Sequence, residues 1–175
     1  MAEGKDEEAL EEAVMGRLAE LGWETIDGYE EELGVEGTLG RDAQSEPVLG
    51  YRLQAAVERL NPDVPVSAVT AAVEEFCEIR KIDPVRANHE KWKLLREGAR
   101  VTVPNPDGSD ETFRVRFVDW DVRDANEWLA VSQFWMDGLP NESEGVKRPD
   151  VIGFVNGIPL LFVELKAPNL SLIHI

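Results

Sequence analysis

The sequence predicts an α+β fold in which a helical N-terminal half is followed by a curved, mainly antiparallel sheet. Up to Gly98, apolar residues recur three and four positions apart, which is the spacing of one helix face. Beyond Gly98 the pattern changes to the alternation of half-buried strands, and Asn156-Gly157 between two apolar runs is a strong signal for a β-hairpin. A chain of 175 residues is long enough to bury a core of ordinary size.

Four helices are expected before Gly98. The first covers residues 7–21 and ends at Gly22, and a looser stretch rich in Gly and Glu follows it from Asp27 to Pro47. The last begins at Asp83-Pro84, with the aspartate as cap and the proline in the first turn. The two between them carry apolar stripes at i, i+3, i+4 and i+7: Leu53, Ala56, Val57 and Leu60 in one, and Val69, Ala72, Val73 and Phe76 in the other.

Strands are expected in the second half of the chain. Residues 100–103 and 112–118 flank a Pro-Asn-Pro-Asp-Gly turn and predict a hairpin. Residues 128–136 form another β-like run, and residues 151–155 and 158–166 flank the Asn-Gly turn of the last hairpin. Helices followed by strands are typical of an α+β domain built around a curved sheet.

The charge of the chain argues against a protein that coats nucleic acid by bulk electrostatics. The net charge is −17, and residues 1–50 hold 15 Asp and Glu against 3 Lys and Arg. A hydrolase that binds a phosphodiester through a metal ion remains compatible with this charge, because the metal brings its own positive charge.

Several classes of protein are excluded by the composition. No run approaches the ~20 apolar residues that a membrane-spanning helix needs. Residues 1–9 are acidic and lack an apolar core, so they are not typical of a secretory signal. Cys77 is the only cysteine, which excludes a disulfide framework, and no Cys and His spacing suits zinc. We therefore expect a cytoplasmic protein that contacts no membrane.

Three polar residues stand at the ends of the last hairpin and point to metal-dependent chemistry. Asp150 opens its first strand, and Glu164 and Lys166 interrupt the end of its second strand on one face. Two carboxylates can hold Mg²⁺, which lowers the pKa of a bound water, and a nearby lysine can offset the charge of a transition state. Pro149-Asp150 followed by Glu-x-Lys one strand later is the PD-(D/E)xK nuclease pattern.

The chemistry constrains the register of this hairpin. A two-residue Asn156-Gly157 loop would pair Val155 with Ile158 and send Asp150 and Glu164 to opposite faces, because a slip of one residue reverses every side chain. We therefore expect a three-residue loop with Gly157 left-handed and a bulge, or a bulge further along the hairpin.

The segment from Arg148 to Asn169 closely resembles the nuclease core of the restriction (R) subunit of type I restriction-modification enzymes. Softer matches are spread upstream, so that the resemblance covers roughly residues 15–169: Leu21-Gly22-Trp23, Leu60-Asn61-Pro62, Asn88 to Gly98, Val115 to Trp120 and Asn126 to Phe134. It implies a sheet of the PD-(D/E)xK restriction-endonuclease-like type, truncated at its C-terminus. It also implies that Asp150, Glu164 and Lys166 are catalytic, with Asp150 and Glu164 as the ligands of Mg²⁺.

The resemblance further implies the setting of the activity. The substrate is double-stranded DNA, and the partners are the methylation and specificity subunits of a type I complex. The full-length subunit of that family also has an ATP-driven DNA translocase. This chain has no G-x-x-x-x-G-K-[ST] motif, so its ATP site is expected elsewhere, and we expect the chain alone to be inactive.

Two alternatives remain beside this interpretation. One is another PD-(D/E)xK nuclease, such as a stand-alone defence or repair enzyme. The other is a non-enzymatic interaction module in which Glu164 and Lys166 form a structural pair.

The expected organisation has three parts. Residues 1–47 are an acidic helix and loop region, and residues 48–169 hold the helices and the nuclease core sheet of the same domain. Residues 170–175 read as the translation of a sequencing adapter, so the genuine protein is expected to end at Asn169.

Overall fold

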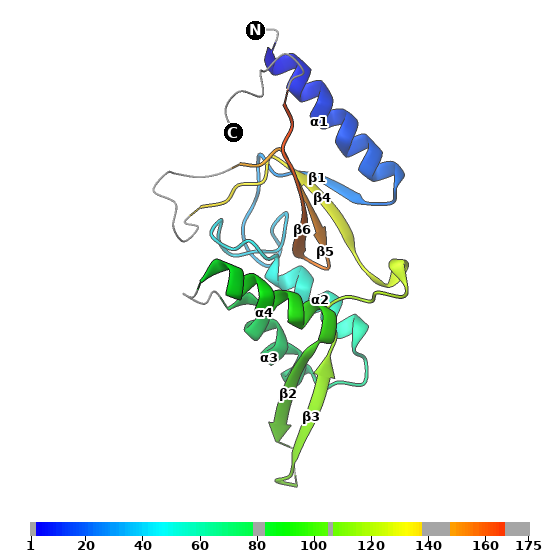
Figure 1. Ribbon diagram of the computed structural model, residues 1–175, viewed down its shortest axis with the longest axis vertical. Helices are drawn as coiled ribbons and strands as arrows, with labels where there is room; N and C mark the ends of the chain where they lie inside the picture. Colours follow the sequence, from blue (N-terminus) through cyan, green and yellow to red (C-terminus); the bar gives the residue numbers. More distant parts are fainter. Residues whose placement is uncertain (1–2, 79–82, 105–106, 138–147, 167–175) are drawn as a thin grey trace. The chain divides into compact units, whose positions relative to one another are not determined.

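The computed structural model describes residues 3–78, 83–104, 107–137 and 148–166. Four helices, α1 to α4, occupy much of the first hundred residues and most of the strands follow them, so the predicted α+β class is confirmed (Figure 1). Within the described ranges, no helix is long and apolar enough to cross a membrane.

The chain divides into two compact units. Unit 1 combines the described parts of residues 1–47, 128–154 and 159–175, and unit 2 comprises those of residues 48–127 and 155–158. The expected adapter sequence, Leu170–Ile175, lies outside the described residues.

Unit 1 is built on a four-stranded sheet with the order β1-β4-β5-β6. Its strands are β1 (Glu24–Asp27), β4 (Trp128–Ser132), β5 (Val151–Val155) and β6 (Ile158–Val163). β1 runs parallel to β4. β4 and β5 run antiparallel, because Gln133 N–H donates to the carbonyl of Asp150 while Asn156 N–H donates to that of Glu127. The sheet is therefore mixed. β1 was not expected from the sequence, because three of its four residues are exposed and only Ile26 is half-buried.

Helix α1 (Glu3–Glu20) packs on this sheet and confirms the first expected helix. Its Leu18 is buried with Ala130 of β4 and Val151 of β5. Leu10 and Leu21, near the two ends of the expected helix, are exposed, whereas Val14 and Leu18 between them reach the core.

Gly153 allows an aromatic ring to lie directly on β5. A Cβ atom at this position would come within 2.8 Å of a ring carbon of Trp23 and 2.9 Å of the Cβ of Leu161. Trp23 also meets Trp128 of β4 edge to face, with ring centroids 5.1 Å apart. The packing of unit 1 therefore requires a glycine at position 153.

The expected loose stretch between Asp27 and Pro47 is organised by one buried cation. The Arg41 guanidinium donates two hydrogen bonds to the carboxylate of Glu31, at 2.7 and 2.5 Å, and neither side chain of this pair is more than 1% exposed. Its other N–H groups donate to the backbone carbonyls of Gln44, Glu46 and Trp135. Every donor of the guanidinium is thus satisfied, which a buried charge requires.

Among the strands that the structure describes, β6 forms one edge of the sheet. Leu160, Leu161 and Phe162 are exposed in succession along it, and Phe162 is 61% exposed. Pro159, near the start of the strand, suits an edge position because proline has no N–H for a further strand.

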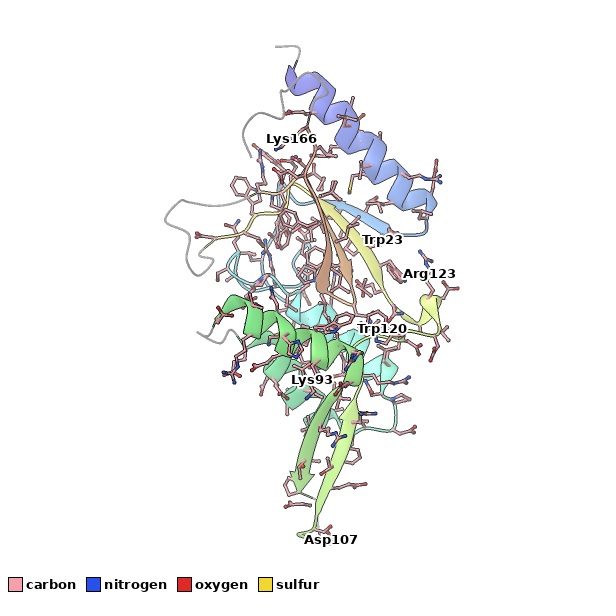
Figure 2. All side chains as sticks on the ribbon, viewed as in Figure 1. Trp23, Lys93, Asp107, Trp120, Arg123 and Lys166 are labelled. Carbon is pink, nitrogen blue, oxygen red and sulfur yellow. The ribbon has the colours of Figure 1, made fainter. Side chains whose placement is uncertain are left out.

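Unit 2 contains the other three helices and a separate hairpin. The helices are α2 (Gly50–Leu60), α3 (Val66–Cys77) and α4 (Pro84–Glu97), and the hairpin pairs β2 (Ala99–Pro104) with β3 (Asp110–Val115). Both expected apolar stripes are buried, and the Asp83 carboxylate caps α4 by accepting from Val85 and Arg86 N–H at 3.1 Å. Figure 2 shows Asp107 at the tip of the hairpin.

Three buried asparagines fix the segment from Arg116 to Glu127, which includes the short 3₁₀ helix η1 (Arg123–Ala125). Asn61 bonds to both the N–H and the carbonyl of Arg116. Asn126 accepts from the N–H of Asp119 at 2.9 Å. Asn156 accepts from the N–H of Glu127 at 2.8 Å and donates to the carbonyl of Phe117 and to Asn126, both at 2.9 Å. Hydrogen bonds from side-chain amides therefore hold the backbone of this segment, which has little regular secondary structure.

The turn between β5 and β6 corrects the register prediction. Asn156 and Gly157 alone separate the strands, with φ of +52° and +79°, so both residues are left-handed as in a two-residue turn. The expected three-residue loop is wrong. The surroundings favour the short turn, because a Cβ on Gly157 would lie 2.7 Å from the carbonyl oxygen of Leu49, whose N–H bonds to Gly157.

We expect Gly153→Ala to destabilise the protein by about 2 kcal/mol, because the added methyl group overpacks the contact with Trp23. The measurement is the free energy of unfolding in urea. Gly16→Ala is the matched control, since nothing lies within 4 Å of a Cβ added there in α1, and it should stabilise by about 0.5–1 kcal/mol. Equal effects of the two changes would contradict the packing described for Gly153.

Asn156→Ala should cost about 3 kcal/mol of stability, because it leaves buried partners unpaired and replaces asparagine, which tolerates positive φ, by alanine, which does so less readily. Asn156→Gly separates these causes, since glycine accepts the backbone angle and loses only the hydrogen bonds. Asn88→Ala, at an exposed position of α4, serves as control in the same denaturation experiment. A stability of Asn156→Gly equal to wild type would show that the side-chain bonds contribute nothing.

Candidate functional site

The three predicted site residues lie at the end of the β5–β6 hairpin that is remote from its turn. Asp150 immediately precedes β5, and Glu164 and Lys166 follow the end of β6. Figure 2 shows Lys166 beyond β6. Because the strands of a hairpin run antiparallel, the start of the first and the end of the second lie side by side.

One hydrogen bond joins these two ends. The Asp150 carboxylate accepts the backbone N–H of Leu165, with an oxygen–nitrogen distance of 2.5 Å. Leu165 stands between Glu164 and Lys166, so Asp150 reaches the segment that carries both residues. Asp150 is half-buried, whereas Glu164 and Lys166 are exposed to solvent.

Asp150 and Glu164 lie just outside the two strands of the hairpin. The strict alternation of faces applies to residues within strands, but β5 begins at Val151 and β6 ends at Val163. Asp150 and Glu164 both lie one residue outside. The two-residue turn therefore does not dictate that their side chains point to opposite faces.

A further carboxylate, Glu11 of α1, interacts with Asp150 electrostatically. Burial raises the pKa of Glu11 above its usual value, and the negative charges of Asp150 and Asp27 raise it further. The hydrogen bond from Gln133 and the positive charge of Arg148 act in the opposite direction. Carboxylates from α1, β1 and the start of β5 thus share one electrostatic environment.

Gln133 connects α1 with the start of β5. Its side-chain amide donates to Glu11, and its backbone N–H donates to the carbonyl of Asp150 at 3.0 Å. Its φ of +53° is unusual for a residue other than glycine and is of the kind found at functional sites. Neither Glu11 nor Gln133 was expected at the site from the sequence. Glu11 stands in an acidic run, and Gln133 has no motif around it.

Arg148 supplies positive charge close to these carboxylates. Its guanidinium lies 5.0 Å from the ring centroid of Trp135 and 5.6 Å from that of Tyr29. Both distances are typical of a cation held over aromatic faces. The side chain is exposed, so its charge faces solvent beside the start of β5.

Asp150 and Glu164 are oxygen donors, which is the kind of ligand that Mg²⁺ binds. Within the described residues, no three or more His, Cys, Asp or Glu side chains form a group that could hold a metal. Mg²⁺ in enzymes is commonly held by one or two carboxylates and keeps several water molecules. Asp150 and Glu164 could supply such carboxylates.

The chain is similar to known proteins over nearly its whole length. Residues 4–173 match the family described as "Type I restriction enzyme R protein N terminus (HSDR_N)". The chain is 37% identical over 164 residues to the "Type I restriction enzyme HindI endonuclease subunit" of Haemophilus influenzae, which covers 93% of this chain and 15% of that protein.

A second relative is more distant. It is the "Putative type I restriction enzyme MjaIXP endonuclease subunit" of Methanocaldococcus jannaschii, which is 26% identical over 160 residues, or 91% of this chain and 15% of that protein. The chain therefore spans about 15% of the length of both relatives. On the family match and the identity to the Haemophilus protein, the chain belongs to the family of type I restriction enzyme R protein N-termini.

Proposed function

We propose that this chain is the nuclease region of a type I restriction endonuclease subunit and cleaves the phosphodiester bonds of double-stranded DNA in a Mg²⁺-dependent reaction. Membership of the family supports the class of enzyme. The observation that carries the site is the hydrogen bond from Leu165 to Asp150, because it holds a carboxylate against the Glu164–Lys166 segment.

Each of the three residues has a distinct role in this proposal. Asp150 and Glu164 hold Mg²⁺, which when bound polarises the phosphate and lowers the pKa of a coordinated water. The Leu165 N–H fixes the rotamer of Asp150, so that this carboxylate is oriented before the metal binds. The exposed Lys166 ammonium orients the attacking water and offsets the negative charge that develops on the phosphate.

Glu11 and Gln133 support the same site. Gln133 holds Glu11 from its side chain and the Asp150 carbonyl from its backbone, which places a second acidic group near the first. Burial and neighbouring negative charge disfavour ionised Glu11 in the absence of a cation. A divalent cation would relieve this repulsion, so Glu11 favours its binding.

The rest of the enzyme lies outside this chain in the proposal. The two relatives are several times longer, which leaves room for the ATP-driven translocase that the family resemblance implies. The methylation and specificity subunits are the proposed partners and select the DNA site, and the complex acts in the cytoplasm.

In the intact subunit that carries this chain, Asp150→Ala, Glu164→Ala and Lys166→Ala should each lower the rate of DNA cleavage by at least about 10²-fold, because each removes a ligand or charge used in the transition state. ATP hydrolysis should be unchanged. The exposed Asp124→Ala, in η1, is the control and should cleave like wild type. Near wild-type cleavage by the Lys166 variant would refute the assignment.

A metal titration distinguishes the nuclease from a non-enzymatic module. Mg²⁺ should raise the melting temperature of the chain, because a ligand that binds the folded state stabilises it. Asp150→Ala should abolish this shift, whereas Asp124→Ala should retain it.

The pKa of Glu11 tests the electrostatic contact directly. In Asp150→Asn the negative charge of Asp150 is lost, so we expect the pKa of Glu11 to fall toward its ordinary value while burial keeps it partly raised. The measurement is a titration of the Glu11 carboxyl carbon by NMR. Asp119→Asn removes a carboxylate absent from the groups that act on Glu11 and should leave this pKa unchanged. The same pKa in wild type and Asp150→Asn would show that the two carboxylates do not interact.

A further inference from the structure

Two arginines stand directly opposite each other on the β2–β3 hairpin of unit 2. The register pairs Arg100 with Arg114, and both side chains are exposed. Like charges in directly opposed positions of an antiparallel pair destabilise the sheet. The Arg100–Arg114 pair therefore has no structural advantage in the free protein, and an anion between the two guanidinium groups would convert repulsion into attraction.

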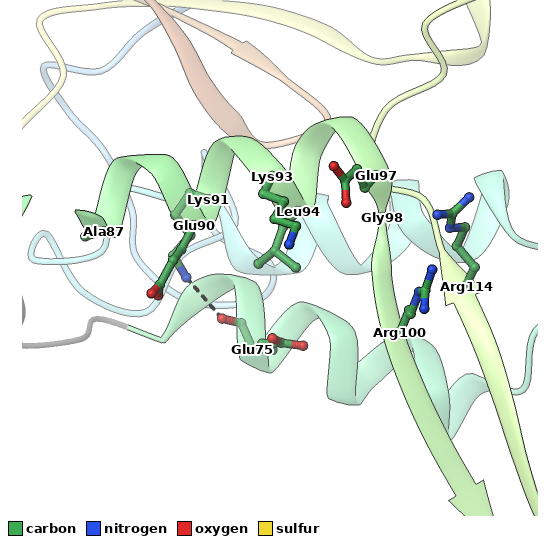
Figure 3. Close-up of a pocket in the computed structure, with 10 residues that line it drawn as sticks. All are labelled: Glu75, Ala87, Glu90, Lys91, Lys93, Leu94, Glu97, Gly98, Arg100 and Arg114. Carbon is green, nitrogen blue, oxygen red and sulfur yellow. Dashed lines mark hydrogen bonds between the residues drawn. The ribbon is translucent and has the colours of Figure 1, made fainter. Parts of the chain in front are cut away.

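A third cation faces the same place. Lys93 of α4 lines a pocket of about 460 Å³ together with both arginines and Glu97 (Figure 3). A hydrogen bond from Arg96 lowers the pKa of Glu97, and the charges of Lys93 and Arg114 contribute to this shift. Glu97 is thus already engaged by Arg96. Within the described ranges, neither an ion pair nor a side-chain hydrogen bond engages Lys93, Arg100 or Arg114.

The acidic residues of the pocket restrict where an anion can lie. Glu75 and Glu90 also line the pocket, and Figure 3 shows Glu90 with Lys91 at the end away from the two arginines. Lys91 is occupied, because its ammonium donates to the last backbone carbonyls of α3. An anion is therefore favoured at the base of the hairpin and repelled from the other end.

The local charge differs from that of the whole chain. The described residues 83–104 and 107–115, which cover α4, β2 and β3, hold six Lys and Arg against six Asp and Glu, whereas the full sequence holds 18 against 35. A stretch without net charge in a strongly acidic protein repels a polyanion less than the rest of the chain does.

We propose that Lys93, Arg100 and Arg114 form a binding site for a backbone phosphate of duplex DNA. Arginine presents paired N–H groups that match the geometry of a phosphate, and the lysine adds a point charge. Such a contact carries no sequence information and positions the duplex. DNA as the occupant rests on the proposed function, but the site shares no residue with the proposed catalytic triplet and its binding can be measured without cleavage.

The test measures binding of the full 175-residue chain to a fluorescent DNA duplex over a series of salt concentrations, without Mg²⁺. In the variant Arg100→Thr/Arg114→Thr we expect the affinity to fall about tenfold or more and the slope of log K against log salt to fall by about 0.9, which is the value for one lost phosphate contact. Lys93→Ala should also lower the affinity, with no loss of slope beyond that of this one contact.

Two variants separate this site from general charge. Arg17→Ala/Arg123→Ala removes the same net charge from exposed arginines elsewhere and should leave the slope nearly unchanged. Arg100→Lys/Arg114→Lys keeps the charge but loses the paired geometry, so the slope should persist while the affinity falls. Failure of the nuclease assignment would show in the cleavage measured for the catalytic variants, whereas this experiment measures binding by variants outside the proposed catalytic triplet.

Stability provides an independent readout. The melting temperature of Arg100→Thr/Arg114→Thr without DNA should equal or exceed that of wild type, because the change removes a repulsive pair and introduces a residue that favours strands. A lower melting temperature would show that the arginines are structural and overturn the proposal.

Other outcomes would also overturn it. These are an unchanged salt slope in the double threonine variant, no DNA binding by the wild-type chain at the lowest salt, and displacement of DNA by inorganic phosphate or polyglutamate as effectively as by unlabelled duplex. The last result would assign the site to a small anion or to an acidic protein segment instead.

Discussion

Two adjacent residues with positive φ, Asn156 and Gly157, determine how the last hairpin is connected to the rest of the chain. The Asn156 side chain bonds to the N–H of Glu127, which immediately precedes β4, and to the carbonyl of Phe117. Gly157 lies against the backbone at the start of α2 so closely that no side chain fits. The hairpin brings the start of β5 beside the end of β6, where the Asp150 carboxylate accepts from the N–H of Leu165.

In the acidic segment of unit 1, the buried side chain of Arg41 fixes the conformation of the chain. A region with 15 acidic and 3 basic residues in its first 50 positions would be expected to repel itself, yet one buried guanidinium organises the stretch between Asp27 and Pro47. The buried pair itself adds little stability, but removing either partner would destabilise the protein strongly, because the other charge would stay buried and unpaired. The ion pair therefore specifies a conformation for a stretch that has almost no regular secondary structure.

Much of the fold could be predicted because its helices and its last turn are determined by residues close together in the sequence. The stripes of α2 and α3, the Asp83 cap of α4 and the Asn-Gly turn each depend on residues close in sequence. β1 was not predicted because its partner strand is distant in the sequence, with Glu24 paired to Leu129. Its four residues are mostly exposed and show no strand pattern of their own.

The candidate site shows the same limit. Asp150, Glu164 and Lys166 were identified by their spacing, whereas Glu11 and Gln133 approach Asp150 from other elements. The expected three-residue loop does not form, whereas the alternative expectation, a bulge further along the hairpin, stays a prediction. The hydrogen bond from Leu165 to Asp150 joins residues 15 positions apart, and the periodicity of the sequence does not encode such a contact.

The exposed edge of β6 has a consequence for handling the protein. An edge strand offers unpaired backbone groups to any other chain, and Leu160, Leu161 and Phe162 add apolar side chains along the same stretch. Pro159 blocks pairing only near the start of the strand. The residues after it combine strand propensity with low charge, which is the composition of segments that stack into intermolecular sheets. A concentrated solution of this chain would therefore convert slowly into β-rich aggregates, and a charged substitution on the outer edge would slow that conversion.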